Sequence, residues 1–110
     1  MEKQQKLVAA LENGSVIDHI PTDKLFAVAQ LLQLEMCTEP VLIGNNLESQ
    51  VMGKKGIIKI ADKFFEDEEL NKLALIAPKA TVNIIRDFKV VEKKVLKMPA
   101  EIIGMAKCQN

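Results

Sequence analysis

The hydrophobic positions of the chain follow two different patterns, and their order along the sequence indicates the fold. Short apolar runs bounded by turn residues predict strands. Longer segments with apolar residues at steps of three and four predict helices. The predicted strands cover residues 6–11, 15–20, 41–49, 57–64, 80–88 and 89–99, and the first two form either one bent strand or a hairpin around Glu12-Asn13-Gly14.

Two segments have the helical pattern. In the first, residues 24–34, Leu25, Val28, Ala29 and Leu32 lie on one face. Thr22 is its predicted N-cap, with Asp23 favourable in the first turn. The second helix, within residues 65–78, has an acidic first turn, apolar steps at Leu70, Leu73 and Ala77, and a stop at Pro78.

The remaining connections contain glycine, proline and polar residues. Gly44-Asn45-Asn46 interrupts the strand at 41–49 and predicts a bulge or bend. Residues 50–56, "QVMGKKG", are predicted to be a loop, because they carry two glycines and two lysines.

This order predicts an α+β fold, a ferredoxin-like two-layer sandwich. Its sheet would have four to five mostly antiparallel strands, with two helices on one face and the other face partly open. Alternation along a strand places Asn83 with Ile85 and, opposite them, Val82 with Ile84. If Val82 and Ile84 face the helices, Asn83 and Ile85 face outward. Alternation also separates Ile58 and Ile60 from Ile57 and Lys59, so Lys59 would lie on a sheet face among apolar residues.

Composition and charge restrict the classes of function. The chain has 110 residues, of which 48% are hydrophobic, and this suits one globular domain. Fifteen basic residues balance fifteen acidic ones, so no overall field favours nucleic acid or anionic lipid, and an anion site would have to be local. There is no apolar run of membrane-spanning length, no signal-peptide core and no aromatic RNA-stacking pattern. We therefore expect a cytoplasmic protein that binds neither nucleic acid nor membrane.

The motifs of known catalytic sites are also missing from the sequence. It has no nucleophile elbow, no His-Glu-x-x-His and no phosphate-binding glycine loop, because Gly53-Lys54-Lys55-Gly56 lacks the spacing. Asp18 and His19 are neighbours, so they would point to opposite sides of a strand and make a poor catalytic dyad unless the chain bends there. A lone histidine beside a turn can also be a purely structural hydrogen-bonding residue.

A mononucleotide suits the polar side chains better. An amide can read a base edge, a carboxylate or lysine a ribose, and several cations a triphosphate. Asn83, Asp18, Lys59 and Lys93 supply these groups, and His19 could add a phosphate donor. Taken alone, the same lysines could be solvated surface.

Four blocks in register resemble the regulatory chain of aspartate carbamoyltransferase. They are "VIDHIP", "GKKGIIKI", "LALIAPKATVNIIRDFKVV" and "AKC", and the similarity runs from about Lys6 to the last residue. The family's chain has an N-terminal allosteric domain that binds nucleotides, followed by a small domain that holds zinc on four cysteines and docks onto the catalytic chain. The resemblance implies a nucleotide-binding allosteric domain over residues 1–98, and a linker with the first residues of a truncated zinc domain over residues 99–110.

The resemblance also implies roles for individual residues. Asp18 would contact the ribose or base region, His19 the phosphates, and Lys59 the ribose and phosphate. Asn83 and Ile85 would surround the base and ribose, while Val90 and Lys93 would supply a wall and a phosphate-binding cation. The base would be read by the backbone of four residues, Val8, Ala9, Ala10 and Leu11. The first zinc ligand would be Cys108.

Two positions depart from the family's pattern. Ala9 stands where an acidic residue can occur, and Phe88, also assigned to the nucleotide site, stands where a tyrosine can occur. The preference between pyrimidine and purine nucleotides is therefore left open. The lysines of "MGKKG" leave open a second nucleotide or a metal-bridged phosphate.

The function implied is that of a non-catalytic regulatory subunit in pyrimidine biosynthesis. CTP, ATP and UTP would be its effectors, zinc its metal, and its partners the catalytic chain and a second regulatory chain. We expect the chain as given to bind nucleotide, with no control of catalysis by itself. The rival classes are a small ferredoxin-like enzyme, such as a phosphatase with a cation pocket, and a protein-interaction module.

Overall fold

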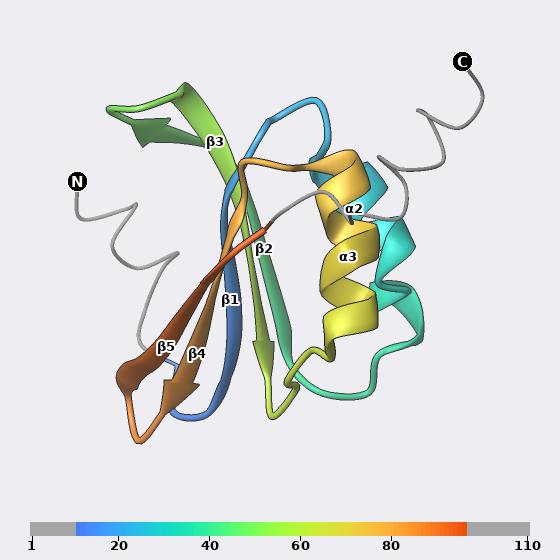
Figure 1. The fold of residues 1–110 in the computed structure, drawn as a ribbon, viewed down its shortest axis with the longest axis vertical. Coiled ribbons are helices and arrows are strands. Elements are labelled where there is room, and N and C mark those ends of the chain that lie inside the picture. Colours follow the sequence, from blue (N-terminus) through green and yellow to red (C-terminus); the bar gives the residue numbers. More distant parts are fainter. Residues whose placement is uncertain (1–10, 97–110) are drawn as a thin grey trace, which may run out of the picture.

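The fold is a two-layer sandwich, as the sequence predicts. The computed structural model describes residues 11–96. Figure 1 shows the two α-helices together on one side of a single sheet, with no described element on the other side. The first and last predicted strand segments extend into residues 1–10 and 97–110, which lie outside the described part of the chain.

The sheet contains five strands, and every neighbouring pair is antiparallel. The strand order is β2-β3-β1-β4-β5, so β1 is central and β2 and β5 form the edges. The first four strands and two helices have the βαββαβ arrangement of ferredoxin-like folds, and β5 extends it. The strand bounds are β1 Gly14–Ile20, β2 Val41–Ser49, β3 Gly53–Ala61, β4 Thr81–Arg86 and β5 Lys89–Val95.

The main core lies between the sheet and the helices α2 (Leu25–Leu31) and α3 (Asp67–Ile76). Val82 and Ile84 belong to this core, which confirms that Asn83 and Ile85 face the other way. At full burial, each aliphatic side chain in such a core contributes about 1.5–3 kcal/mol. Its largest fully buried members are Ile17, Ile20, Leu25, Ile58, Ile60, Leu73, Val28 and Val82.

The first helix is shorter than predicted. α2 ends at Leu31, Gln33 adopts a left-handed conformation with φ 55°, and a separate 3₁₀ turn η1 covers Leu34–Met36. The N-cap is Lys24, without a side-chain cap, so the assignment of Thr22 as N-cap was wrong. The backbone N–H of Lys24 instead donates to the carbonyl of Pro21, which forms a turn before the helix begins.

The second helix begins with a capping box, which accounts for its acidic start. Glu66 caps the backbone of Glu69, and the Glu69 carboxylate accepts a hydrogen bond from the Glu66 N–H at 3.1 Å. The three acidic residues of the first turn also suit the positive end of the helix dipole. The C-cap is Ala77, directly before Pro78, as predicted. No helix within residues 11–96 is long and apolar enough to cross a membrane.

The loop predicted at 50–56 was wrong over most of its length. β3 begins at Gly53, so both lysines of that segment belong to a strand. Glycines normally weaken a strand interior, but pairing of β3 with β2 outweighs this local preference. The bulge predicted in β2 is confirmed: the register shifts between Gly44 and Leu47, and Asn46 has φ 61°.

Candidate functional site

One cross-strand row on the open face contains three of the predicted binding residues. Leu42 pairs with Lys59, Lys59 with Val16, Val16 with Asn83, and Asn83 with Lys93. Directly paired residues share a face. Lys59, Asn83 and Lys93 therefore lie in one row, with Val16 between Lys59 and Asn83, and strand spacing puts about 14 Å between the backbone positions of the two lysines.

Lys59 is the buried cation of this row. Its side chain starts from a strand with neighbours on both sides, and only 8% of the residue is exposed. Burial lowers the pKa of the Lys59 ammonium, because low-dielectric surroundings disfavour its charged form. The carboxylate of Asp18 opposes this effect and raises the pKa. An incoming anion would stabilise the same charge further.

Asp18 and His19 lie at a bend of β1, which changes the expected alternation. The register shifts between Ile17 and Ile20, and His19 has φ 59°, in the left-handed region. The His19 backbone N–H donates to Asp18 Oδ1 at 2.7 Å, and His19 Nδ1 lies 3.9 Å from Asp18 Oδ2. The bend that would let the neighbouring side chains of Asp18 and His19 lie on the same side of the strand is thus present.

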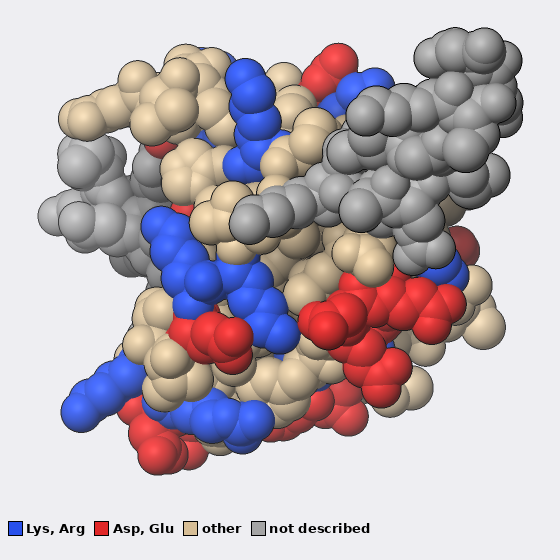
Figure 2. Space-filling view, viewed as in Figure 1, with Lys and Arg blue, Asp and Glu red and all other residues tan. Residues whose placement is uncertain are grey.

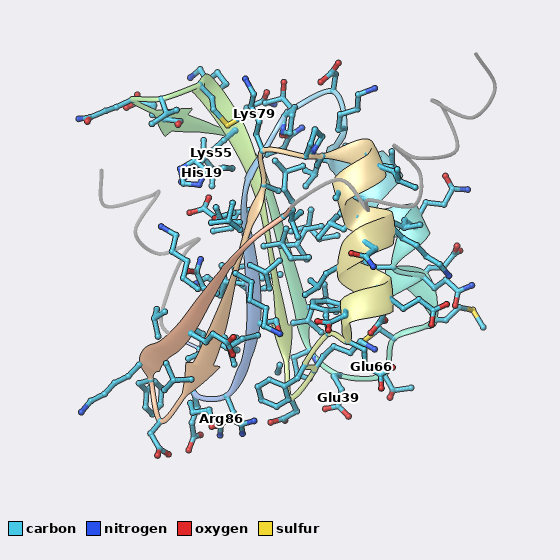
Figure 3. The ribbon with its side chains drawn as sticks, in the orientation of Figure 1. His19, Glu39, Lys55, Glu66, Lys79 and Arg86 are labelled. Atoms are coloured by element: carbon cyan, nitrogen blue, oxygen red, sulfur yellow. The ribbon has the colours of Figure 1, made fainter. Side chains whose placement is uncertain are left out.

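The bend leaves both side chains half-buried on the open side of the sheet. His19 Nδ1 lies 3.4 Å from Thr81 Oγ1 on β4. Figure 3 shows His19 on the side of the sheet away from the helices. Within residues 11–96, the serine and cysteine side chains have other contacts: Ser15 donates to the Lys63 carbonyl, Ser49 accepts from the Met52 N–H, and Cys37 lies near Glu39.

Lys55 belongs to this site, and sequence reasoning did not assign it there. Its ammonium lies 2.8 Å from Asp18 Oδ1. Figure 3 shows it beside His19, on the same side of the sheet. Lys55, Ile57 and Lys59 alternate along β3, so the signal was present in the sequence. The loop assignment hid it, because alternation has meaning only within a strand.

The open face also carries apolar side chains, and Ile85 lies at the end of it that is opposite Lys55. Val16, Leu47, Ile57 and Ile85 form a second buried cluster, and Leu11 packs against it. Val90, directly opposite Ile85 on β5, is exposed beside it. Such a surface can contact the flat, weakly polar side of a base or sugar.

The β4–β5 turn is fixed to the segment before β1. The Phe88 N–H donates to the Glu12 carbonyl at 2.9 Å, and the Asp87 N–H donates to Asn13 Oδ1 at 3.2 Å. Phe88, with φ 65°, has 62% of its surface exposed. Its side chain is therefore not part of the core, and its backbone lies beside Glu12, the residue that follows Leu11.

The remaining predicted residues fall outside the described part of the chain. These are Val8, Ala9 and Ala10, and the predicted zinc ligand Cys108. Within residues 11–96, no group of three or more His, Cys, Asp or Glu residues could hold a metal ion.

Comparison with known proteins identifies the family. The model of the allosteric domain of the aspartate carbamoyltransferase regulatory chain matches residues 6–97. The chain belongs to the family of aspartate carbamoyltransferase regulatory chains. This confirms the resemblance found in the sequence, and a regulatory chain of this enzyme implies a catalytic chain as its partner.

Individual regulatory chains are similar over nearly the whole sequence. One from Porphyromonas gingivalis is 57% identical over 110 residues, covering 100% of this chain and 73% of its own length. One from Bacteroides thetaiotaomicron is 58% identical over 108 residues, with 98% and 71% covered. One from the archaeon Pyrococcus abyssi is 47% identical over 105 residues, with 94% and 69% covered. All three are called aspartate carbamoyltransferase regulatory chains.

Proposed function

We propose that the open face of the sheet binds a nucleoside triphosphate without transforming it, and that this binding regulates aspartate carbamoyltransferase. The observation that supports this most is the single row of Lys59, Asn83 and Lys93 across four adjacent strands. An amide between two cations offers hydrogen bonds to a base or sugar and charge to phosphates. The row's length of about 14 Å suits an extended ligand rather than a small ion.

The site has a direction, which suggests how a nucleotide lies in it. Leu11, Ile85 and Val90 form its apolar end, next to the start of β1. Asp18, His19 and Lys55 form its charged end, four residues or about 14 Å further along β1. We place the base at the apolar end and the phosphates at the charged end. Val8, Ala9 and Ala10, just before Leu11, are then close enough in sequence to read the base through their backbone.

The proposed mechanism is regulation by differential binding. A nucleotide changes the activity of a distant catalytic chain only if it binds two quaternary states unequally, with coupling typically of about 1–3 kcal/mol. CTP, ATP and UTP would compete for the one site. In this mechanism Asp18 and His19 bind and orient the ligand, and no residue of the site breaks a bond.

Two further parts of the proposal concern the rest of the chain. We keep residues 1–98 as the allosteric domain, and residues 99–110, including Cys108, as the linker and the start of a zinc domain. A structural zinc site takes four ligands. The sequence has two cysteines and one histidine, so the residues present do not complete such a site, and no step of the proposed mechanism uses zinc.

We also propose that two regulatory chains pair through their allosteric domains. The edge strand β2 exposes backbone groups that another strand could pair with. Next to this edge lies an apolar groove of about 460 Å³, lined by Ala29, Gln30, Leu34, Glu35, Val41 and Ile43. Ile43 is an exposed large hydrophobic residue in the groove, and a second copy would cover it.

Titration calorimetry with CTP and with ATP tests the nucleotide site. We expect saturable binding without release of phosphate, weakened at least about tenfold in Lys59→Ala and in Lys93→Ala, because each removes a cation that faces the ligand. Lys94→Ala is the matched control. It removes the same charge one residue further on, but Lys94 pairs with the core residue Val82 and therefore faces the helix side.

Three other outcomes of these titrations would each contradict a part of the proposed nucleotide site. Release of inorganic phosphate would favour the phosphatase-like enzyme. Absence of binding in the wild-type chain would favour an interaction module. Equal losses in Lys93→Ala and Lys94→Ala would show that general positive charge, rather than the open face, attracts the nucleotide.

A further inference from the structure

The charged end of the open face extends beyond the strands to the connection between α3 and β4. Thr81, the first residue of β4, pairs with Asp18 and lies against His19. Residues 77–80 turn sharply, with the Ala80 N–H donating to the Ala77 carbonyl at 3.1 Å. Lys79 is in this turn, two residues before Thr81. Strand geometry places it up to about 7 Å past the Asp18–Thr81 pair.

Lys79 is available to a ligand at this end. It is exposed, and its ammonium has no hydrogen bond or ion pair with the residues that the structure describes. Figure 3 shows Lys79 at the same end of the sheet as His19 and Lys55, with Arg86 at the opposite end of β4. The four-carbon stem of a lysine gives its charge reach and freedom to turn toward an anion.

Charge at this end is otherwise partly neutralised. Asp18 Oδ1 already contacts Lys55 at 2.8 Å, and Asp18 also interacts with Lys59. A chain of three phosphates that extends past these residues would reach the turn before β4, where Lys79 supplies a further positive charge.

We propose that Lys79 is an additional binding residue of the site, which contacts the terminal phosphate of the nucleotide and so favours triphosphates over monophosphates. The proposal depends on the nucleotide site proposed above and adds to it the recognition of phosphate number. In this arrangement His19 and Lys55, on the sheet, bind an inner phosphate. Lys79, beyond the end of β4, binds the terminal phosphate.

The test compares CTP, CDP and CMP binding by titration calorimetry in wild type and Lys79→Gln. We expect Lys79→Gln to weaken CTP binding about threefold, as is typical for one solvent-exposed charge pair. CMP binding should be unchanged, because its phosphate does not reach the turn. The CTP difference should shrink as salt rises from 50 to 500 mM, because salt screens exposed charges. Lys79→Glu should weaken CTP binding more than Lys79→Gln does, since the substitution reverses the charge.

Lys94→Gln is the control, with the same loss of charge on the helix side of the sheet. Its CTP and CMP affinities should both stay at the wild-type values. Unchanged CTP binding in Lys79→Gln, or an equal loss for CTP and CMP, would overturn the role of Lys79. Neither result would contradict the proposed nucleotide site. That proposal would be contradicted if wild type binds no CTP, or if Lys59→Ala binds CTP with the wild-type affinity.

Discussion

At the scale of single residues, burial of a charge decides the character of the site. Lys59 lies on a central strand, where a hydrophobic residue of similar length would pack without loss of hydration. The protein instead keeps an ammonium there, with its pKa lowered by burial. A charge that burial destabilises is consistent with a residue retained for binding rather than for folding.

Replacing Lys59 by methionine should therefore separate folding from binding. We expect Lys59→Met to raise the free energy of unfolding at pH 7 by about 1 kcal/mol, because it removes a desolvated charge. Nucleotide affinity should fall at least about tenfold. Urea unfolding and calorimetry on the same samples measure both quantities.

The pH dependence of this stability difference has a defined sign. The folded-state pKa of Lys59 is below the ordinary lysine value of 10.5, so the cost of the buried charge is fully present at pH values below this lowered pKa. As pH rises from the lowered pKa toward 10.5, the folded chain loses this proton before the unfolded chain does. In that range the free energy of unfolding of wild type should therefore rise toward that of Lys59→Met. A difference between the two proteins that grows with pH would contradict the assignment.

Gly14 is a second residue whose chemistry is fixed by its position. It has φ 145°, and a Cβ there would collide with the Ile60 carbonyl of the neighbouring strand. Gly53 also has a positive φ, 81°, but a Cβ there would have open space.

The two glycines make a matched pair of alanine substitutions. Gly14→Ala should lower the free energy of unfolding by about 3 kcal/mol, because it adds a clash to backbone strain. Gly53→Ala should cost about 1 kcal/mol, from strain alone. Thermal and urea denaturation give both values, and equal losses would show that contact with β3 is unimportant at Gly14.

At the scale of elements, the same local signals succeeded in one helix and failed in the other. The acidic residues before Leu70 indicated a helix start, and α3 begins there with a complete capping box. Thr22 offered the same kind of signal before α2, but the chain makes a turn at Pro21 and enters the helix at Lys24. A cap residue specifies a helix start only if the backbone after it is helical at once.

The capping box gives a prediction for α3. Glu69→Ala removes the acceptor of the Glu66 N–H and an ion pair of 3.4 Å with Lys63, so it should cost about 1 kcal/mol of unfolding free energy. Glu68→Ala, one residue earlier, removes only an exposed pair of 3.9 Å with Lys72 and should cost about 0.3 kcal/mol. Chemical denaturation distinguishes the two, and losses of equal size would rule out a special role for the cap.

At the scale of the whole molecule, charge is sorted although the total is zero. Figure 2 shows acidic side chains gathered over the start of α3 and basic side chains beside them over β5. The first turn of α3 contains Asp67, Glu68 and Glu69, and β5 contains Lys89, Lys93 and Lys94. A balanced composition therefore excludes a general field and still allows a local anion site on the open face.

Pairing of two chains can be tested at the β2 edge. Ile43→Glu places a charge in the apolar groove beside this edge, on a side chain that is already 39% exposed. We expect wild type to dimerise in sedimentation velocity and Ile43→Glu to stay monomeric at the same concentration, because inward charge on an edge prevents strand pairing. Circular dichroism should show the same fold for both. A dimeric Ile43→Glu would place the contact elsewhere.

The sequence by itself determined the types of the elements, the order that makes the two-layer fold, the alternation of β4 and the family. These depend on local periodicity and on matching blocks of residues. Only the tertiary structure decided that β3 includes Lys55, that β1 bends at His19, and that Lys59, Asn83 and Lys93 share one row. The reason is that register joins strands far apart in sequence, and cross-strand pairing can override local preferences for loops and straight strands.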